Sequence, residues 1–168
     1  MPTRVLGLDP GIALMGYGII EDRDGNLSTI DYGGLSTKSK QSTPERLLAL
    51  YNGVIKLIEL HKPTEVAVEL FVARNLKTAL IVGEARGVAL LAAASKGLPV
   101  YDYTPLQVKQ RVSGYGRGEK RQVQEMVKMQ LGLSCIPEPD DAADALAVAI
   151  CHISEARLSR LLANSSGK

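Results

Sequence analysis

Val5-Leu6-Gly7-Leu8-Asp9-Pro10-Gly11 combines an apolar strand with a carboxylate at its end. Residues 3–8 are apolar enough to predict a central strand that is buried on both faces. Pro10 favours an extended Asp9, and Gly11 permits a tight turn after it. Because side chains alternate along a strand, Gly7 shares a face with Asp9 and leaves space beside the carboxylate. A buried charge there needs an opposite charge or a cation, although an Asp that simply begins a turn is also common.

The composition is that of an ordinary globular protein, with 168 residues, 45% hydrophobic and 23% charged. This length predicts one compact domain, residues 1–162, followed by a frayed tail, 163–168. Cys135 and Cys151 have neither metal-ligand nor disulfide-framework spacing, which indicates free thiols in a reducing cytoplasm. We expect no signal sequence and no apolar run that approaches a membrane span. The net charge of +2 does not by itself indicate a nucleic-acid partner.

The order of apolar patterns predicts a mixed five-stranded sheet with helices on both faces, an α/β fold in one domain. Thr43 is the expected N-cap of the first helix, with Pro44 at the first helical position. The first three strands have short connections and should form an antiparallel meander, whereas a strand that follows a helix crossover should pair in parallel. Expected strands cover residues 3–8, 15–21, 27–35, 65–70 and 99–103, and expected helices cover 43–61, 76–96, 105–111, 120–131 and 141–162.

Carboxylates recur at the ends of buried elements. Glu69 ends the strand 65–70 as Asp9 ends the first one, with small Ala67 on the same face. Asp141 and Asp144 lie three residues apart, so both project from one face of a helix. Two simpler interpretations stay open, an exposed Glu at a strand end and acids that favour a helix N-terminus through the dipole. Asp140 is interpreted as the N-cap of that last helix.

Four buried carboxylates without His or Cys neighbours indicate hard oxygen ligands for Mg²⁺ or Mn²⁺. Two such ions roughly 3.5–4 Å apart form the clamp that cleaves phosphodiesters in line. The sequence offers no Ser/His/Asp triad and no P-loop. His152 lies within the buried last helix, where a packed, hydrogen-bonded role is expected.

A set of motifs in this chain resembles the RuvC family of bacterial Holliday junction resolvases. They are Leu6-Gly7-Leu8-Asp9-Pro10-Gly11, Val68-Glu69, Gly83-Glu84-Ala85-Arg86-Gly87-Val88, Gln107-Val108-Lys109-Gln110 and Asp141-Ala142-Ala143-Asp144-Ala145-Leu146-Ala147. The resemblance covers nearly the whole chain in the family's order. It implies an RNase H-like fold, a cytoplasmic homodimer, and metal-dependent symmetric nicking of two strands of a four-way DNA junction during recombination and repair.

The resemblance also assigns roles to particular residues. The metal-binding acids correspond to Asp9, Glu69, Asp141 and Asp144, and basic positions near the scissile phosphate correspond to Lys109 and Lys120. It further implies two Mg²⁺ ions per site, replaceable by Mn²⁺, and the RuvA–RuvB branch-migration complex as a partner.

Basic residues cluster between positions 109 and 128, where the local charge exceeds that of the whole chain. Together with the Gly-rich loop 114–118, this stretch is predicted to follow a phosphate backbone. A solvated helix face beside a loop is the simpler alternative. The candidate DNA contacts are Lys109, Arg111, Arg117, Lys120 and Arg121.

Phe71 is the single Phe of the chain and comes two residues after Glu69. An aromatic ring beside the metal site can stack on an unpaired base at the junction centre, and Arg74 is a candidate phosphate contact. RuvC-family members usually place the aromatic residue three positions after the Glu, so this loop is one residue short. A core Phe at a strand end is the alternative.

Three other functions are alternatives to this interpretation. The turn after Asp9 also resembles the phosphate loop of actin-like sugar kinases, which need two such domains. A non-catalytic junction-binding protein would not need the four acids. The YqgF family, which is RNase H-like and acts on RNA, agrees less well with the basic stretch and the long helix rich in small residues.

Overall fold

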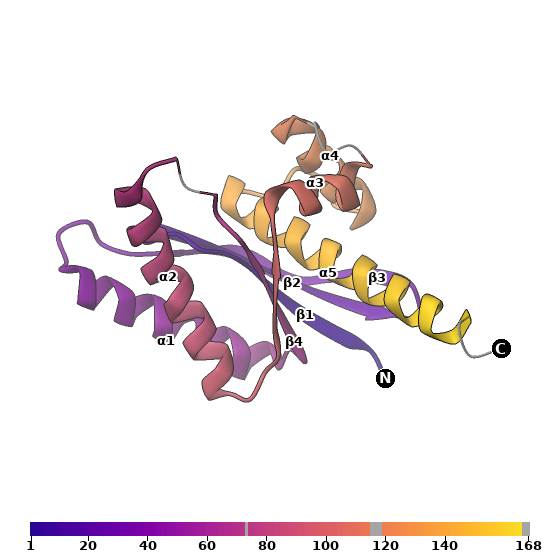
Figure 1. The fold of residues 1–168 in the computed structure, drawn as a ribbon, viewed down its shortest axis with the longest axis horizontal. Coiled ribbons are helices and arrows are strands. Elements are labelled where there is room, and N and C mark those ends of the chain that lie inside the picture. The colour runs from indigo at the N-terminus through magenta and orange to yellow at the C-terminus, as the bar shows by residue number, and fades with distance from the viewer. Residues whose placement is uncertain (73, 115–118, 166–168) are drawn as a thin grey trace.

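A five-stranded sheet forms the centre of the computed structural model, which describes residues 1–72, 74–114 and 119–165. The strand order is β3-β2-β1-β4-β5 (Figure 1). β1 pairs antiparallel with β2 and parallel with β4, so the sheet is mixed, as predicted. The strands are β1 (Thr3–Asp9), β2 (Leu14–Arg23), β3 (Asn26–Ser36), β4 (Glu65–Glu69) and β5 (Val100–Tyr103).

Helices cover both faces of this sheet, which confirms the expected layers. Helices α1 (Thr43–His61) and α2 (Leu76–Ser95) cover the face that carries Leu6, Leu8 and Val68. Helix α5 (Asp140–Ser165) crosses the opposite face (Figure 1). Helices α3 (Pro105–Ser113) and α4 (Lys120–Gln130) pack against α5 on the side away from the sheet.

Two predicted helix caps are wrong by one residue. Ser42 caps α1 in place of Thr43, and its amide and hydroxyl groups both donate to the Glu45 carboxylate. Asp140 is the first residue of α5 instead of its cap, because the Pro139 carbonyl accepts the helix's first hydrogen bond from Ala143. Helix α5 also continues to Ser165, beyond the predicted end at 162.

Helix α2 corrects the expectation that no apolar run approaches a membrane span. By length and composition alone, the helix could cross a membrane. The same test is passed by core helices of proteins that enter no membrane, so it is weak evidence. Here one face of α2, with Ala85, Ala89, Ala92 and Ala93, is buried against α1 and the sheet. The other faces of the helix are more exposed.

Small residues on β1, β2 and β4 let α5 lie directly on the sheet. A Cβ atom on Gly7 would lie 2.1 Å from the Ala145 carbonyl oxygen, and one on Gly16 would lie 1.9 Å from that of Asp141. Ala67 pairs with Gly7 in register and is fully buried on the same face. The space predicted beside Asp9 is therefore filled by the backbone of α5.

We expect Gly16→Ala to destabilise the protein, because its Cβ would push against a rigid helix backbone. Overpacked cores lose about 1–3 kcal/mol, and each kcal/mol lowers Tm by about 2–4 °C at this size. Gly34 is the matched control, since it pairs with Gly16 across the β2–β3 ladder. Its Cβ would meet the movable end of the Leu14 side chain, so Gly34→Ala should cost much less. Equal melting temperatures for the two variants would contradict this account.

Candidate active site

Four carboxylates from three elements meet at one edge of the sheet. Asp9 ends β1 and Glu69 ends β4, and the parallel pairing of these neighbouring strands brings both ends to the same edge. Asp141 and Asp144 extend from the first turns of α5, which Gly7 and Gly16 admit onto the strands. The structure thus brings together all four acids singled out in the sequence.

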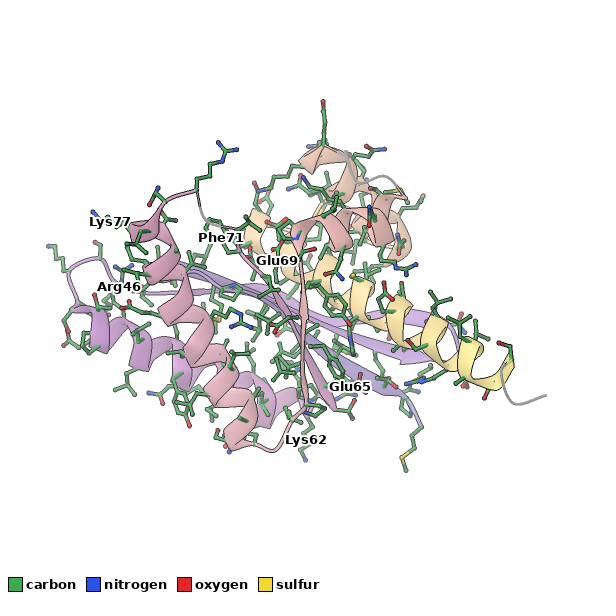
Figure 2. The ribbon with its side chains drawn as sticks, in the orientation of Figure 1. Arg46, Lys62, Glu65, Glu69, Phe71 and Lys77 are labelled. Carbon is green, nitrogen blue, oxygen red and sulfur yellow. The ribbon has the colours of Figure 1, made fainter. Side chains whose placement is uncertain are left out.

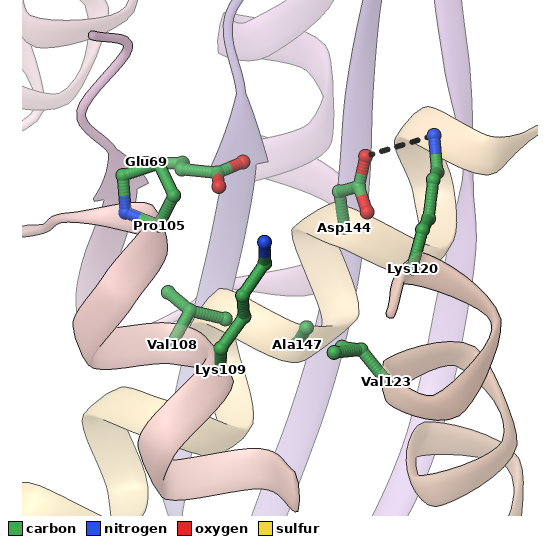
Figure 3. Close-up of a pocket in the computed structure, with 8 residues that line it drawn as sticks. All are labelled: Glu69, Pro105, Val108, Lys109, Lys120, Val123, Asp144 and Ala147. Carbon is green, nitrogen blue, oxygen red and sulfur yellow. Dashed lines mark ion pairs between the residues drawn. The ribbon is translucent and has the colours of Figure 1, made fainter. Parts of the chain in front are cut away.

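The carboxylates line two adjoining hollows. One hollow of about 360 Å³ contains Asp9, Glu69, Asp141 and Asp144, and Phe71 is part of its wall. The second, of about 200 Å³, shares Glu69 and Asp144 with the first and is closed by Lys109 and Lys120 (Figure 3). Acids and lysines therefore face one continuous recess.

Burial and mutual repulsion raise the pKa values of Asp9, Glu69 and Asp144, which makes these three carboxyl groups hard to ionise. Burial, followed by the charges of Glu69, Asp144 and Asp141, raises the pKa of Asp9 to about 8. The pKa of Glu69 rises to about 7, again mainly through burial and then through Asp144. Burial also raises the pKa of Asp144, against the opposing effect of Lys120. At neutral pH the metal-free site holds protons that ordinary carboxylates would have lost.

The chemistry of this donor set fits a divalent cation. Asp9 and Glu69 retain protons at neutral pH because their raised pKa values reflect burial beside other carboxylates. A hard cation neutralises the same charges and accepts oxygen ligands. Among the described residues, no three His, Cys, Asp or Glu side chains are already arranged to hold an ion. A bound cation would replace these protons as the neutralising charge.

Two lysines reach the acids from separate helices. The Lys120 Nζ atom lies 3.0 Å from Asp140 Oδ2 and 3.8 Å from Asp144 Oδ2. Its hydrogen bond to Asp140 is the main cause that raises the Lys120 pKa, so the ammonium stays charged. Lys109 on α3 points into the recess between Glu69 and Asp144 (Figure 3) and lowers the pKa of Glu69.

Three of the four arginines singled out in the sequence line neither hollow of this recess. Arg111 pairs with Glu155 on α5, and Arg121 pairs with Glu125 at 3.0 Å along α4. Arg74 is exposed in the segment before α2. Arg117 lies outside the described residues.

Phe71 lies beside Glu69 where the chain leaves β4 toward α2 (Figure 2). Its side chain is 52% exposed, so the interpretation as a core Phe is wrong. The ring lines the hollow that contains Asp9 despite the short loop after Glu69.

His152 has the packed role predicted for it. It is buried, with Nδ1 2.7 Å from the Tyr103 hydroxyl and Nε2 2.6 Å from Glu65 Oε2. Glu65 lies at the end of β4 opposite to Glu69 (Figure 2). His152 is therefore remote from the four carboxylates of the recess.

The start of α3 is a part of the site that was not predicted from the sequence. Pro105 lines both hollows, and Thr104 caps the helix by accepting a hydrogen bond from the Gln107 amide at 3.2 Å. Gln107 Oε1 accepts in return from the Thr104 amide at 2.8 Å. The pattern Thr-Pro-x-Gln is a recognisable capping box and could have fixed the position of Lys109 on the first turns of α3.

The fold and the carboxylate site define the class of RNase H-like resolvases. Within this class the chain belongs to the RuvC family, because the family model "Crossover junction endodeoxyribonuclease RuvC" matches residues 5–152. The family implies a divalent metal cofactor. This membership also separates the chain from the sugar-kinase and YqgF interpretations.

Individual relatives agree with this assignment. The chain is 59% identical over 150 residues to the crossover junction endodeoxyribonuclease RuvC of Chloroflexus aurantiacus, covering 89% of this chain and 92% of that one. It is 36% identical to T. thermophilus RuvC solved in complex with a Holliday junction substrate, with a TM-score of 0.89, covering 94% and 96% of the two chains. The yeast mitochondrial resolvase Ydc2 shares the fold at 16% identity, with a TM-score of 0.65 and coverage of 94% and 82%.

The raised pKa values predict a pH-dependent stability in the metal-free protein. The folded state binds protons at Asp9 and Glu69 up to about pH 8 and 7, whereas the unfolded chain releases them near pH 4. The stabilisation of the folded state by these bound protons is complete at low pH, and it is lost as the pH rises through the raised pKa values of Asp9 and Glu69. Tm measured in EDTA should therefore fall between roughly pH 5 and pH 8.

Asp9→Asn removes one of the repelling charges and should raise Tm at pH 8 in EDTA. Mg²⁺ should raise the Tm of the unchanged protein at pH 8 and raise that of Asp9→Asn much less. A Mg²⁺ shift of equal size in both proteins would remove Asp9 from the cation site.

Proposed function

We propose that this chain resolves four-way DNA junctions by metal-dependent, paired nicking of two symmetric strands in recombination and repair. The observation that carries the proposal is the recess in which four partly buried carboxylates face Lys109 and Lys120. The junction-bound T. thermophilus relative supports the choice of substrate.

Each group of the recess has a distinct part in this proposal. Asp9, Glu69, Asp141 and Asp144 would hold two Mg²⁺ ions, which Mn²⁺ could replace. A metal pair there would supply Lewis-acid chemistry for phosphodiester hydrolysis. Lys120 stabilises the charge that develops on the scissile phosphate, and Lys109 is a second cation for the same group.

The remaining basic residues are proposed to contact phosphates farther from the cut. These contacts position the DNA without reading its sequence. Arg111 bonds Glu155 through Nε and Arg121 bonds Glu125 through one terminal nitrogen, so each keeps further N–H donors for a phosphate. Arg74 and Arg117 complete the set.

We expect Asp9→Asn to reduce Mg²⁺-dependent junction nicking by about 10²–10³-fold or more, the scale of losing one electrostatic contact to a transition state. Junction affinity should stay unchanged, because binding depends on phosphate contacts. The same holds for Glu69→Gln, Asp141→Asn and Asp144→Asn. Asp24→Asn at the β2–β3 turn is the control and should cleave normally. Normal nicking by any one of the four variants excludes that residue from the site.

A homodimer is the proposed assembly, since one two-fold axis can relate both the protein copies and the two cut strands. Its proposed interface is the outer face of α2, where Leu76, Leu80 and Leu91 are 75%, 60% and 61% exposed. Cβ atoms on Gly83 and Gly87 would meet nothing within 4 Å, so a second helix can approach closely. The RuvA–RuvB complex is the proposed partner in the cytoplasm.

Sedimentation equilibrium should give twice the chain mass of 18.0 kDa. Leu80→Glu places a charge on the proposed interface and should yield monomers. A monomeric unchanged protein at micromolar concentration, or a dimeric Leu80→Glu variant, would contradict this interface.

Phe71 is proposed to stack on an unpaired base at the junction centre. Phe71→Ala should weaken contact with the opened junction by roughly 1–3 kcal/mol and slow cleavage. Its Tm should barely change, because the exposed ring contributes little to the core. Leu60→Ala on α1 removes another exposed apolar side chain, away from the recess and from α2, and serves as the control for cleavage. Unimpaired cleavage by Phe71→Ala would contradict the proposed stacking role.

A further inference from the structure

Lys120 is held by a carboxylate that does not belong to the proposed metal site. It is the first residue of α4, and its ammonium lies 3.0 Å from Asp140 Oδ2. The nearest acid of the recess, Asp144, is farther away at 3.8 Å. Asp140 lines neither hollow, and Lys120 is the lining residue with which it forms an ion pair.

The second oxygen of Asp140 is also engaged. Gln124 Nε2 donates to Asp140 Oδ1 at 3.0 Å. Gln124 lies one turn after Lys120 on α4 and is only 7% exposed, so its amide is a fixed donor. Asp140 therefore receives hydrogen bonds from both Lys120 and Gln124, which lie on one face of α4. Because Gln124 is buried, its hydrogen bond fixes the orientation of the Asp140 carboxylate.

We infer that Asp140 is a positioning residue, which together with Gln124 holds the Lys120 ammonium at the rim of the recess beside Asp144. The inference rests on the proposed nuclease function. An ammonium group has three N–H donors. With one on Asp140 and one directed at Asp144, the third is available to an oxygen of the scissile phosphate.

The ion pair between Lys120 and Asp140 positions the Lys120 ammonium more than it stabilises the fold. The Lys120 and Asp140 side chains are 57% and 63% exposed, and such surface pairs contribute little to the free energy of unfolding. A flexible lysine at the start of a helix otherwise samples many rotamers, and small displacements at a reacting centre are costly. Loss of Asp140 should therefore lower the cleavage rate while Tm stays nearly constant.

A double-mutant cycle tests the inference. Single-turnover nicking at saturating four-way junction and Mg²⁺ is measured for Asp140→Asn, Lys120→Ala and the double variant. We expect Asp140→Asn to nick about 3–10-fold more slowly, with junction Kd unchanged, and Lys120→Ala to lose more. The double variant should be no slower than Lys120→Ala alone, because Asp140 acts through that lysine. Additive losses, a weakened Kd or an unchanged rate in Asp140→Asn would overturn the inference.

Glu125→Gln is the matched control. It removes a carboxylate that pairs with Arg121 at 3.0 Å on the same helix, outside the recess. Its nicking rate should stay within twofold of the unchanged protein. A loss equal to that of Asp140→Asn would mean that any acidic charge on this surface has the same effect, which contradicts a specific role.

A measurement on the protein without DNA separates this inference from the proposed function. The ¹⁵N signal of the Lys120 ammonium should shift between the unchanged protein and Asp140→Asn, and Glu125→Gln should leave it in place. An unmoved Lys120 signal would overturn the contact whether or not the protein cuts junctions. Absence of junction nicking by the unchanged protein would reject the proposed function and leave the spectroscopic result standing.

Discussion

The direct seating of α5 on the sheet is the contact on which the candidate site depends. Two helix carbonyls occupy the positions where side chains of Gly7 and Gly16 would be, so any larger residue there must displace the helix. The same contact determines how close Asp141 and Asp144 on α5 lie to Asp9 on β1. Packing and chemistry are therefore joined, because one close approach buries the core face of the helix and assembles the acids.

The assembled site carries a cost in stability. Burying carboxylates beside one another raises the pKa of Asp9 and Glu69, so a fully ionised, metal-free site opposes folding. Fully buried neighbours such as Leu6, Leu8 and Val68 hold the strands in place against that repulsion. A divalent cation would relieve it, which couples metal binding to folding.

The surrounding cations differ in how they are held. Lys109 follows a capped helix start, whereas Lys120 depends on an ion pair with Asp140 at the beginning of another helix. Arg111 and Arg121 are paired away from the acids. A basic stretch that is continuous in sequence is thus divided in space, with Lys109 and Lys120 at the recess and Arg111 and Arg121 outside it.

Local strand and helix periodicities were enough to predict the mixed sheet, the two strand-end acids and the acidic helix start. The first turns of α1 and α5 were misjudged by one residue although their contacts are local, since Ser42-x-x-Glu45 is a capping box and the Pro139 carbonyl accepts from Ala143. The exposure of Phe71, the contact between Asp140 and Lys120, and the place of Pro105 in the site are visible in the folded structure alone. These outcomes depend on contacts between residues far apart in the chain, and no local pattern encodes such distances.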